Sequence, residues 1–494
     1  MRGPRRGFDN GEERQTSGAS PRIIGGAGAT EDCPAPTVRE RFLTYERLVS
    51  HGRVRLREDA LAIANKALFA ADPTCALRRS LQLDGTTLFA GDPTTGVRYP
   101  VDLAGGRVFV VGAGKASMDM AAALDDLLGA RIADGVVVVK RGQAPARLPG
   151  HIEIIEAAHP VPDEASLRGG LRMLGIVEQA RPDDLLLALV TGGSSSLAVA
   201  PAAGISLEDK ILTNRLLLAS GADIIAINNV RKHLSRIKGG LLARAAGCRI
   251  LNLTVSDVVG DPPDYFTDLT VPDRSTFAMA QAVCERFHLW EGLPASVAGR
   301  LRRADPSQET ARAHEFPEGR IVTVVLANAT LMCEAAVREA ERLGYAGSIV
   351  SLAVEGDAAR AGRDLAARLG TAGPAACLIE GGENTVAFRD GRLDEGLGGP
   401  SQEAALAAAA RLAAGPAACI LCLDSDGSDG PTDAAGGLVD DLSMRAAAAR
   451  GVDVELALAG HRSYAALAAL DDLAVTGPTG TNVNDLKIGL KARE

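Results

Sequence analysis

Short turns rich in glycine, serine and lysine follow several apolar runs of this chain. The first turn reads V-G-A-G-K-A-S at residues 111–117, directly after a β-branched run. Glycine lets backbone N–H groups converge on an anion, because a Cβ would block the approach or forbid a positive φ. The lysine that follows the glycines favours a phosphoryl group or a carboxylate as the bound anion. We therefore expect Gly112 and Gly114 to line an anion site and Lys115 to reach its ligand.

Two nucleotide motifs resemble this turn without matching it. A Walker A loop needs an earlier glycine at the position that Phe109 occupies. The turn matches the dinucleotide motif G-x-G-x-x-G except at the last position, where Ser117 replaces glycine. Binding of NAD also requires an acidic residue at the end of the next strand. That strand ends in Lys140 and Arg141, which disfavours NAD but suits the extra phosphate of NADP. An NADP-linked reductase therefore stays open as an alternative.

A second turn reads T-G-G-S-S-S at residues 191–196, after the apolar run 185–190. Six small or hydroxyl residues in a row offer N–H and O–H donors to one anion. The pattern G-x-S-x-G does not occur in this turn, so a nucleophile elbow is not expected here. We expect Ser194, Ser195 and Ser196 to bind phosphate.

A basic segment at residues 228–240 reads N-N-V-R-K-H-L-S-R-I-K-G-G. Its apolar residues recur at helical spacing, which predicts one helix over 229–245, capped by Asn228 or Asn229. The buried stripe of this helix would consist of Val230, Leu234, Ile237 and Leu241. Its other faces carry four cations: Arg231, Lys232, Arg236 and Lys238. In a chain of net charge −9 these cations indicate an anion site that includes Asn228 and Arg231, with a solvated basic face as the alternative.

Aspartates gather after two other expected strands, at residues 254–262 (T-V-S-D-V-V-G-D-P) and 424–433 (D-S-D-G-S-D-G-P-T-D). The second stretch resembles the start of an EF-hand loop, but the loop's glycine and glutamate are both replaced. Aspartates at strand ends, beside several anion-binding turns, suit Mg²⁺ carried with nucleotide phosphates. Asp257 and Asp426 are the candidates, although an aspartate is also a common turn or cap residue.

The elements that must position these turns alternate between strands and helices. In the first half, strands are expected at 107–111, 135–140, 152–156, 185–190 and 249–255, with helices at 117–128, 164–179 and 229–245. In the second half, strands are expected at 321–327, 348–354, 376–380, 419–424 and 472–476, with helices at 334–343, 357–369 and 402–414. This alternation predicts an α/β fold of two α/β domains, joined near residues 270–320, the larger one Rossmann-like with a parallel sheet. Residues 1–38 lack periodicity, and we expect a disordered extension there.

Composition limits the class of protein. The 494 residues carry 53 Lys and Arg against 62 Asp and Glu, and this acidic balance argues against nucleic acid as a partner. No apolar stretch approaches the roughly 20 residues of a membrane helix, and the polar start lacks the apolar region of a signal peptide. We expect a cytoplasmic enzyme without a membrane partner.

Eight cysteines are scattered along the chain, mostly inside apolar runs, so we expect buried thiols rather than disulfides. Cys419 and Cys422 have the spacing of a redox motif, but residues three apart on a strand point to opposite faces. The seven histidines form no pair at metal-ligand spacing, and a zinc site is not expected.

The stretches at 111–117, 227–240, 256–262 and 426–440, together with three further ones, resemble the glycerate 2-kinase family, whose members are sometimes labelled hydroxypyruvate reductases and carry a C-terminal MOFRL domain. The further stretches read A-H-P-V-P at 158–162, G-G-E-N-T-V at 381–386 and T-G-P-T-G-T-N-V-N-D-L at 476–486. The resemblance implies an active site in the cleft between two α/β domains. It implies a Rossmann-like kinase domain over 39–290, a connecting α/β segment over 291–375, and a MOFRL-type domain over 376–490 whose C-terminal segment returns to the first domain. The loop at 476–486 is expected to enter a helix.

The resemblance also implies transfer of the γ-phosphoryl group of ATP, with Mg²⁺, to a hydroxyl of D-glycerate, usually O2. Lys115 would reach the substrate or the transferring phosphoryl group, Lys232 would lie at the cleft, and Asp257 would act on the metal or as base. The second domain and the returning tail would close the site with Asn384, Asp426 and Asn482. The implied partner is a small hydroxy acid, a homo-oligomer is allowed, and the metal ligands stay unassigned.

The chain departs from the family pattern around the rim of this site. The family's G-G-R-N-Q-E is G-G-P-S-Q-E at residues 398–403, without the arginine. A guanidinium is the natural bidentate holder of a carboxylate, so the acid substrate is left open. The family's S-G-P-T is T-D-L-T at 267–270, and a T-P-K-P-G-D stretch near residue 310 is missing. A kinase of a different or larger hydroxy acid and a non-catalytic acid-binding homologue therefore stand beside the reductase as alternatives.

Overall fold

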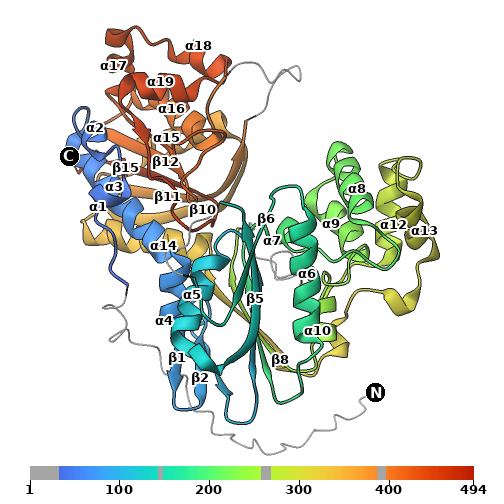
Figure 1. Cartoon of the computed structure of the whole chain (residues 1–494). Coiled ribbons are helices and arrows are strands. Elements are labelled where there is room, and N and C mark those ends of the chain that lie inside the picture. Colours follow the sequence, from blue (N-terminus) through green and yellow to red (C-terminus); the bar gives the residue numbers. More distant parts are fainter. Residues whose placement is uncertain (1–32, 143–147, 258–268, 387–395, 494) are drawn as a thin grey trace, which may run out of the picture.

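The computed structural model describes residues 33–142, 148–257, 269–386 and 396–493. In this part of the chain, two six-stranded sheets flanked by helices occupy the lower and upper halves of the molecule (Figure 1). A three-stranded antiparallel sheet, formed by β1 (Leu81–Asp84), β2 (Thr87–Gly91) and β3 (Arg98–Asp102), is attached to the lower half. Two α/β units were expected from the alternation of strands and helices, and this prediction is confirmed.

The first sheet is parallel throughout and has the strand order β6-β5-β4-β7-β8-β9. Its strands are β4 (Val108–Ala113), β5 (Ile132–Lys140), β6 (Glu153–Ala157), β7 (Leu185–Val190), β8 (Arg249–Val255) and β9 (Ile321–Ala327). Helices cover both faces, with α4 (Pro73–Ser80) and α5 (Ser117–Leu128) on one side and α6 (Glu164–Val177) on the other. Along β4, Val110 therefore packs into one core and Val111 into the other, which explains the continuous apolar run.

The second sheet is mixed and has the order β10-β11-β15-β12-β13-β14. Its strands are β10 (Ala346–Asp357), β11 (Ala376–Thr385), β12 (Ala418–Asp424), β13 (Gly436–Asp440), β14 (Leu473–Ala474) and β15 (Asp485–Lys491). Only the pair β10 and β11 is parallel among these strands. One face is covered by α15 (Ala358–Thr371) and α16 (Pro400–Leu412), with α17 (Ser443–Arg450), α18 (Val454–Ala459) and α19 (Ser463–Leu470) outside them. The other face is covered by α3 (Val54–Ala70) and α14 (Ala329–Arg342).

The C-terminal segment packs against α3, which lies within the expected first domain 39–290, and the helix expected after the loop at 476–486 is wrong. The segment forms β15, which lies between β11 and β12 and is antiparallel to both. Apolar residues alternate along it at Leu486, Ile488 and Leu490, all of them fully buried. A period of two residues is the signature of a strand, so the local pattern agrees with the structure.

The expected connecting segment, residues 291–375, is divided between the two sheets. Its β9 is the edge strand of the first sheet, whereas α14, β10 and α15 belong to the second. Near the start of the chain, α3 packs on the second sheet rather than the first, after the short helices α1 (Val38–Arg41) and α2 (Tyr45–Leu48). The described residues just before α1 are part of the folded structure, whereas residues 1–32 lie outside the described part.

The single helix expected over 229–245 is two helices in the structure. The helix α9 (Ile224–His233) ends before a turn, and α10 (Leu241–Ala245) follows it. The turn contains Gly239 and Gly240 with φ of 64° and 72°, a backbone conformation that interrupts a helix. Helix α9 packs with α8 (Leu207–Ala219), α12 (Phe277–Arg286) and α13 (Ala295–Arg303) into a helical lobe beside the first sheet (Figure 1).

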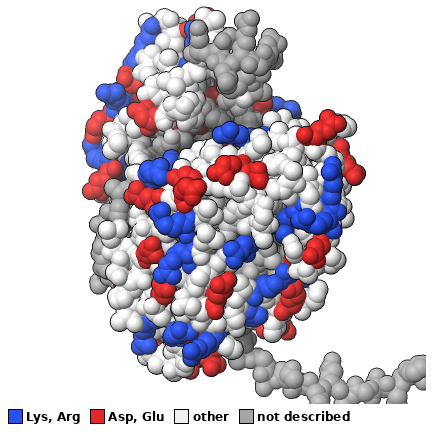
Figure 2. All heavy atoms as spheres, turned by 45° about the vertical axis from the view of Figure 1, so that its right-hand side comes forward, with Lys and Arg blue, Asp and Glu red and all other residues white. Residues whose placement is uncertain are grey.

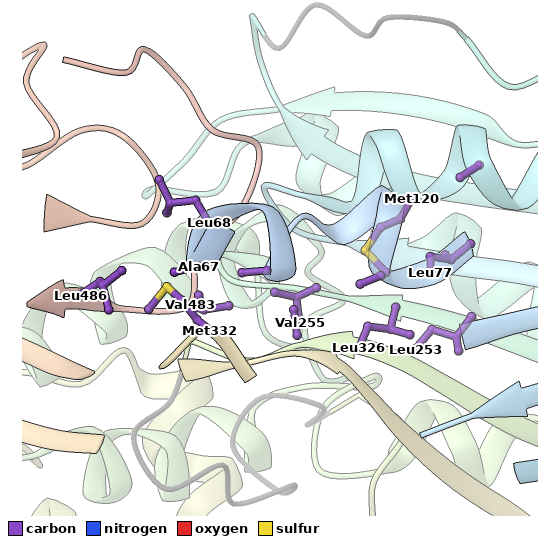
Figure 3. Close-up of a cluster of buried hydrophobic side chains, with 14 of the residues drawn as sticks. Ala67, Leu68, Leu77, Met120, Leu253, Val255, Leu326, Met332, Val483 and Leu486 are labelled. Atoms are coloured by element: carbon purple, nitrogen blue, oxygen red, sulfur yellow. The ribbon is translucent and has the colours of Figure 1, made fainter. Parts of the chain in front are cut away.

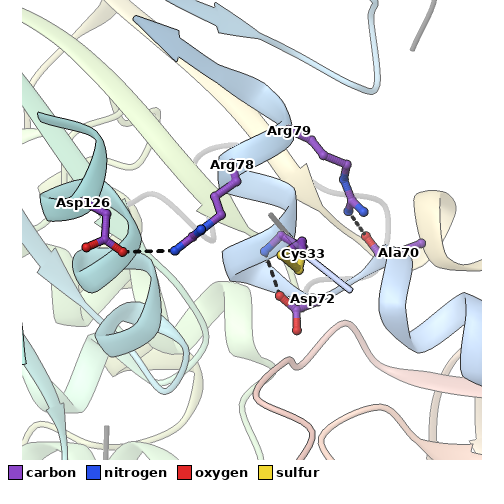
Figure 4. The surroundings of a disulfide bond; sticks show 7 residues. Cys33, Ala70, Asp72, Arg78, Arg79 and Asp126 are labelled. Carbon is purple, nitrogen blue, oxygen red and sulfur yellow. Dashed lines mark hydrogen bonds and ion pairs between the residues drawn. A yellow bond between two sulfur atoms is a disulfide. The ribbon is translucent and has the colours of Figure 1, made fainter. Parts of the chain in front are cut away.

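The expectation of thiols throughout is wrong for one pair of cysteines. Cys33 and Cys75 form a disulfide that fastens the segment before α1 to α4 (Figure 4). Sequence spacing alone did not indicate this pair, because the two residues meet only through the packing of that segment. The other six cysteines are free and buried. Cys419 and Cys422 lie in two different cores, on opposite faces of β12, which confirms their structural role.

A single hydrophobic core runs from the first sheet into the second. Figure 3 shows its middle part, where Leu68 of α3 and Met332 of α14 lie between the two sheets. Val255 and Leu326 reach this core from the first sheet, and Leu486 reaches it from the second. The two units are thus joined by packed side chains as well as by the chain.

The surface carries charges of both signs. On the face in Figure 2, lysine and arginine side chains are interspersed with aspartate and glutamate rather than gathered into one basic area. Within the described ranges, no helix combines the length and the apolar character needed to cross a membrane.

A buried arginine ties α3 to the second domain. The Arg57 guanidinium is fully buried and donates to Asp440 and to Asp472, with N–O distances of 2.6 Å for both. Its remaining N–H groups reach the carbonyl of Leu48 and the hydroxyl of Ser443. Both carboxylates need this cation, because an unpaired buried charge is costly.

A buried aspartate caps α16 at the edge of the second sheet. The Asp429 carboxylate accepts hydrogen bonds from the backbone N–H groups of Ser401 (3.0 Å) and Gln402 (2.7 Å). These two residues occupy the stretch in which the resemblance expects an arginine. Burial raises the pKa of Asp429 to about 7, although the two N–H donors oppose this shift.

We expect Arg57→Met to lower the free energy of unfolding by about 3 kcal/mol, because two buried carboxylates lose their cation. The measurement is urea unfolding at pH 7. Arg55→Met is the matched control on the same helix, since the Arg55 side chain is exposed and its partner Asp59 keeps a hydrogen bond from the Tyr345 hydroxyl. Equal stability of the two variants would contradict the role of Arg57.

We expect Asp429→Asn to gain stability relative to the wild type as the pH rises from 4 to 7. The folded-state pKa of about 7 lies above the unfolded value, so the wild type is favoured at low pH and loses stability as the pH rises through that window. The relative change is at most about 1.4 kcal/mol per pH unit. Urea unfolding at several pH values measures it, with Asp433→Asn in the same loop as control. A difference between Asp429→Asn and wild type that is constant over the window would refute the shift.

Candidate active site

The two predicted anion-binding turns lie against each other at the carboxyl edge of the first sheet. One turn links β4 to α5, and the other links β7 to the short helix α7 (Ser194–Leu197). The backbone N–H of Lys115 donates to the carbonyl of Gly192 (2.9 Å), and that of Ala116 donates to the Thr191 hydroxyl (3.2 Å). Gly114 has a φ of 140°, and a Cβ there would overlap Thr191, so glycine is required. The two turns therefore form one continuous surface.

Three polar side chains gather around the serine turn. A Cβ on Gly192 would overlap the Asp257 carboxylate, so this carboxylate lies directly against the turn. A Cβ on Gly193 would lie 3.0 Å from Nε2 of His159 and 3.5 Å from Cγ of Lys115. Sequence reasoning gave His159 no role, although the A-H-P-V-P stretch that contains it was one of the segments carrying the resemblance.

The surroundings shift the proton affinity of two of these groups. Burial raises the pKa of Asp257, and the nearby Lys115 opposes the shift. Burial, together with the cations Lys115 and Lys140, lowers the pKa of His159. A carboxylate with a raised pKa is a stronger proton acceptor, and an imidazole with a lowered pKa stays neutral near pH 7.

The second domain meets this surface through the aspartates that follow β12. Nζ of Lys115 lies 3.7 Å from Oδ2 of Asp426, which joins the two domains directly. Asp424 is the register partner of Asp485 on β15, and burial with these neighbouring carboxylates raises the pKa of Asp424 to about 8. Burial and the charges of Asp485 and Asp257 raise the pKa of Glu383, on β11. Carboxylates of the second domain thus face the lysine of the first.

The two asparagines of the second domain differ in their surroundings. Asn384 is buried, its backbone N–H lies 3.4 Å from the Asp485 carboxylate, and its Nδ2 donates to the carbonyl of Gly356. Its Oδ1 is buried without a hydrogen-bond partner. Oδ1 of Asn482 accepts a hydrogen bond from the backbone of Asn484 within its own loop. Asn384 therefore lies beside the aspartate cluster, whereas the contact of Asn482 is local.

The basic segment divides its cations between two places. Lys232 is buried and its Nζ lies 2.9 Å from the Asp273 carboxylate. Arg231 donates from Nε to Oδ1 of Asn214 (2.5 Å), and Oδ1 of Asn228 is 3.5 Å from its Nη1. The catalytic role of Lys232 stays a prediction, because its described partner is structural.

A cavity of about 290 Å³ opens beside the serine turn, between α7, α8 and α9. Its polar lining comprises His159, Ser195, Ser196, Lys210, Thr213, Asn214, Arg231 and Lys238. Nζ of Lys238 donates to the hydroxyl of Ser195 (2.8 Å). Lys210 was not singled out from the sequence, whereas Lys238 was one of the four cations that indicated an anion site. Its role depends on the turn after α9, which the helical pattern did not reveal.

Part of the predicted motif S-D-V-V-G-D-P lies outside the described residues. Ser256 and Asp257 are described, whereas the following positions belong to the range 258–268. The first two residues of the T-D-L-T stretch also fall in this range.

Comparison with known proteins agrees with this arrangement. Residues 59–302 match a family model described as a domain of unknown function, DUF4147, and residues 376–485 match the MOFRL family. The chain is 38% identical to a glycerate 2-kinase of Pyrococcus horikoshii over 445 residues, covering 88% of this chain and 97% of that protein. It is 43% identical over 393 residues to a putative hydroxypyruvate reductase of Agrobacterium vitis, covering 77% of this chain and 86% of that protein.

A solved structure has the same fold over nearly its whole length. The glycerate kinase of Thermotoga maritima superposes with a TM-score of 0.77 at 35% identity, covering 89% of this chain and 100% of the other. The sequence similarity extends over both domains and includes nearly the full length of the Pyrococcus protein. On these grounds, the chain belongs to the glycerate 2-kinase family.

Proposed function

We propose that this chain is an ATP-dependent kinase that transfers the γ-phosphoryl group of ATP to a hydroxyl of D-glycerate, at O2. The observation that carries the proposal is the meeting of Lys115, on the glycine turn of the first domain, with Asp426 of the second domain at 3.7 Å. A phosphoryl-transfer enzyme needs positioned cations and backbone donors more than a protein nucleophile. The turns, Lys115 and the facing carboxylates supply this combination.

Each of these residues would have a separate role in phosphoryl transfer. Gly112 lies within β4, paired with strands on both sides, and the N–H of Gly114 donates to the carbonyl of Val138, so these two glycines would shape the turn rather than hold the anion. The hydroxyls of Ser194, Ser195 and Ser196 would hold phosphate oxygens. Lys115 would neutralise the charge that builds up on the transferring group. Asp257 would accept the proton of the substrate hydroxyl as its oxygen bonds to the γ-phosphorus and the bond to ADP breaks. The raised pKa of Asp257 favours this role.

Mg²⁺ fits the carboxylates of the second domain. Within the described residues, no group of three or more His, Cys, Asp and Glu side chains is arranged to hold a metal ion. Mg²⁺ commonly binds one or two protein carboxylates together with substrate phosphates, and it prefers oxygen ligands. Asp424 and Asp426 would provide the carboxylates and the unpartnered Oδ1 of Asn384 a third oxygen. Bound there, the ion would neutralise phosphate charge beside Lys115.

The reductase alternative has less support. Some relatives have that name, but the NADP phosphate would need the cations that follow β5. The Arg141 guanidinium is paired with the Asp163 carboxylate (2.7 Å), so it is already neutralised. Titration of the purified protein with NADPH and with an ATP analogue separates the two activities.

The finer assignments stay predictions. They are the phosphorylated position, the compartment, the oligomeric state and the roles of Asn228, Arg231 and Asn482. The missing arginine at 398–403 keeps the acid substrate open. ATP consumption with a panel of hydroxy acids identifies the preferred substrate, and a protein that consumes ATP with none of them would be a non-catalytic homologue.

We expect Lys115→Met to lower kcat by about a thousandfold, because the transferring group loses its cation. The thermal midpoint should change little, since Lys115 is partly exposed. Lys66→Met, at an exposed lysine of α3, is the control and should keep wild-type turnover. The measurement is a coupled ADP-release assay with ATP and D-glycerate. Full activity of the Lys115→Met variant would show that the Lys115 side chain takes no part in phosphoryl transfer.

We expect chelation of divalent cations to abolish turnover and Mg²⁺ to restore it. Asp424→Asn should need about tenfold more Mg²⁺ for half-maximal activity, because one carboxylate ligand is lost. Mn²⁺ binding in the presence of an ATP analogue, followed by electron paramagnetic resonance, gives a readout independent of turnover. Unchanged Mn²⁺ affinity in the variant would show that Asp424 is not a metal ligand.

A further inference from the structure

The cavity of the first domain has an apolar wall that a small hydroxy acid does not require. Its apolar lining comprises Val199, Leu217, Leu218, Leu234 and the two prolines of the A-H-P-V-P stretch. Each carbon of glycerate carries oxygen, so the acid would gain little from contact with these side chains. A flat, weakly polar ring system would gain from their burial.

The polar part of the same cavity suits phosphate. Lys238 is only 1% exposed, and its ammonium group is held against the Ser195 hydroxyl at 2.8 Å. Lys210 and Arg231 line the cavity as well. Cations and hydroxyls positioned together in this way bind phosphate oxygens.

The cavity adjoins the predicted phosphoryl-transfer site. Gly193 and His159 line it, and Gly193 lies against both His159 and the Lys115 side chain. A chain of phosphates that starts in the cavity can therefore run along the serine turn to Lys115.

We propose that this cavity is the nucleotide subsite, with the adenosine of ATP against the leucines of α8 and α9 and its first phosphates at Lys238 and Ser195. The proposal rests on the proposed kinase function and deepens it. It assigns the acid substrate to Lys115, Asp257 and Asp426, where the second domain meets the turns, in place of the contact between Lys115 and Asp426. Nucleotide and acid then bind on opposite sides of the transferring phosphoryl group.

Two exposed leucines of α8 give a matched test. Leu218 is 59% exposed and lines the cavity, whereas Leu212 is 45% exposed and does not. We expect Leu218→Asp to weaken binding of the ATP analogue AMP-PNP, with Mg²⁺, by at least about tenfold, because a carboxylate would face the base and repel phosphate. Leu212→Asp should bind it within about twofold of wild type. Isothermal titration calorimetry measures both, and the thermal midpoint checks folding.

A measurement on the unmodified protein accompanies the variants. Photolabelling with 8-azido-ATP, followed by peptide mapping, should mark α8 or α9, whereas a label on the second domain would overturn the subsite. Unchanged AMP-PNP affinity in a folded Leu218→Asp variant would also overturn it, as would a raised KM for D-glycerate with unaltered nucleotide binding. Failure of the wild type to bind AMP-PNP at all would instead remove the proposed kinase function, and the subsite with it.

Discussion

Packing of α3 and α14 between the two sheets is the constraint on which the site depends. Their side chains join both sheets in one hydrophobic core, and the buried Arg57 anchors α3 to two carboxylates of the second domain. Because this core lies beside the facing sheet edges, it determines how far apart the glycine turn and the aspartates of the second domain stand. Any movement of one domain relative to the other must therefore take place about these packed side chains. Such a movement would change the distance between Lys115 and Asp426.

The charges that the two domains present to each other are complementary. Lys115 and the serine turn lie on the first domain, whereas Asp424, Asp426 and Glu383 lie on the second. Burial raises the pKa of Asp424, which favours the protonated, neutral form of this carboxyl group. Phosphate would bind to Lys115 and the serine turn of the first domain, and a divalent cation to the carboxylates of the second domain. A metal–nucleotide complex would therefore bind to both domains, whereas a free anion would bind only to the first.

Much of the fold could be predicted from local pattern, because strands buried on both faces and amphipathic helices leave strong periodic signals. The glycine and serine turns were predicted on the same basis, since they follow apolar strands directly. Features that depend on packing between distant segments could not be predicted in this way. They include the disulfide of Cys33, the division of the basic segment at Gly239, and the placement of β15 between β11 and β12. The cavity residue Lys210 was missed for the same reason, since its position beside Lys238 depends on the packing of the helical lobe.

The central position of β15 has a consequence for the order in which the second domain forms. Its neighbours, β11 and β12, have no strand between them until residues 485–491 have emerged from the ribosome. A nascent chain that ends after β14 would carry two unpaired apolar strand edges, which are templates for wrong association. Asp424 would also lack its register partner Asp485 at that stage. Such a chain would depend on chaperones during synthesis, and truncation in the loop before β15 would yield an aggregating protein.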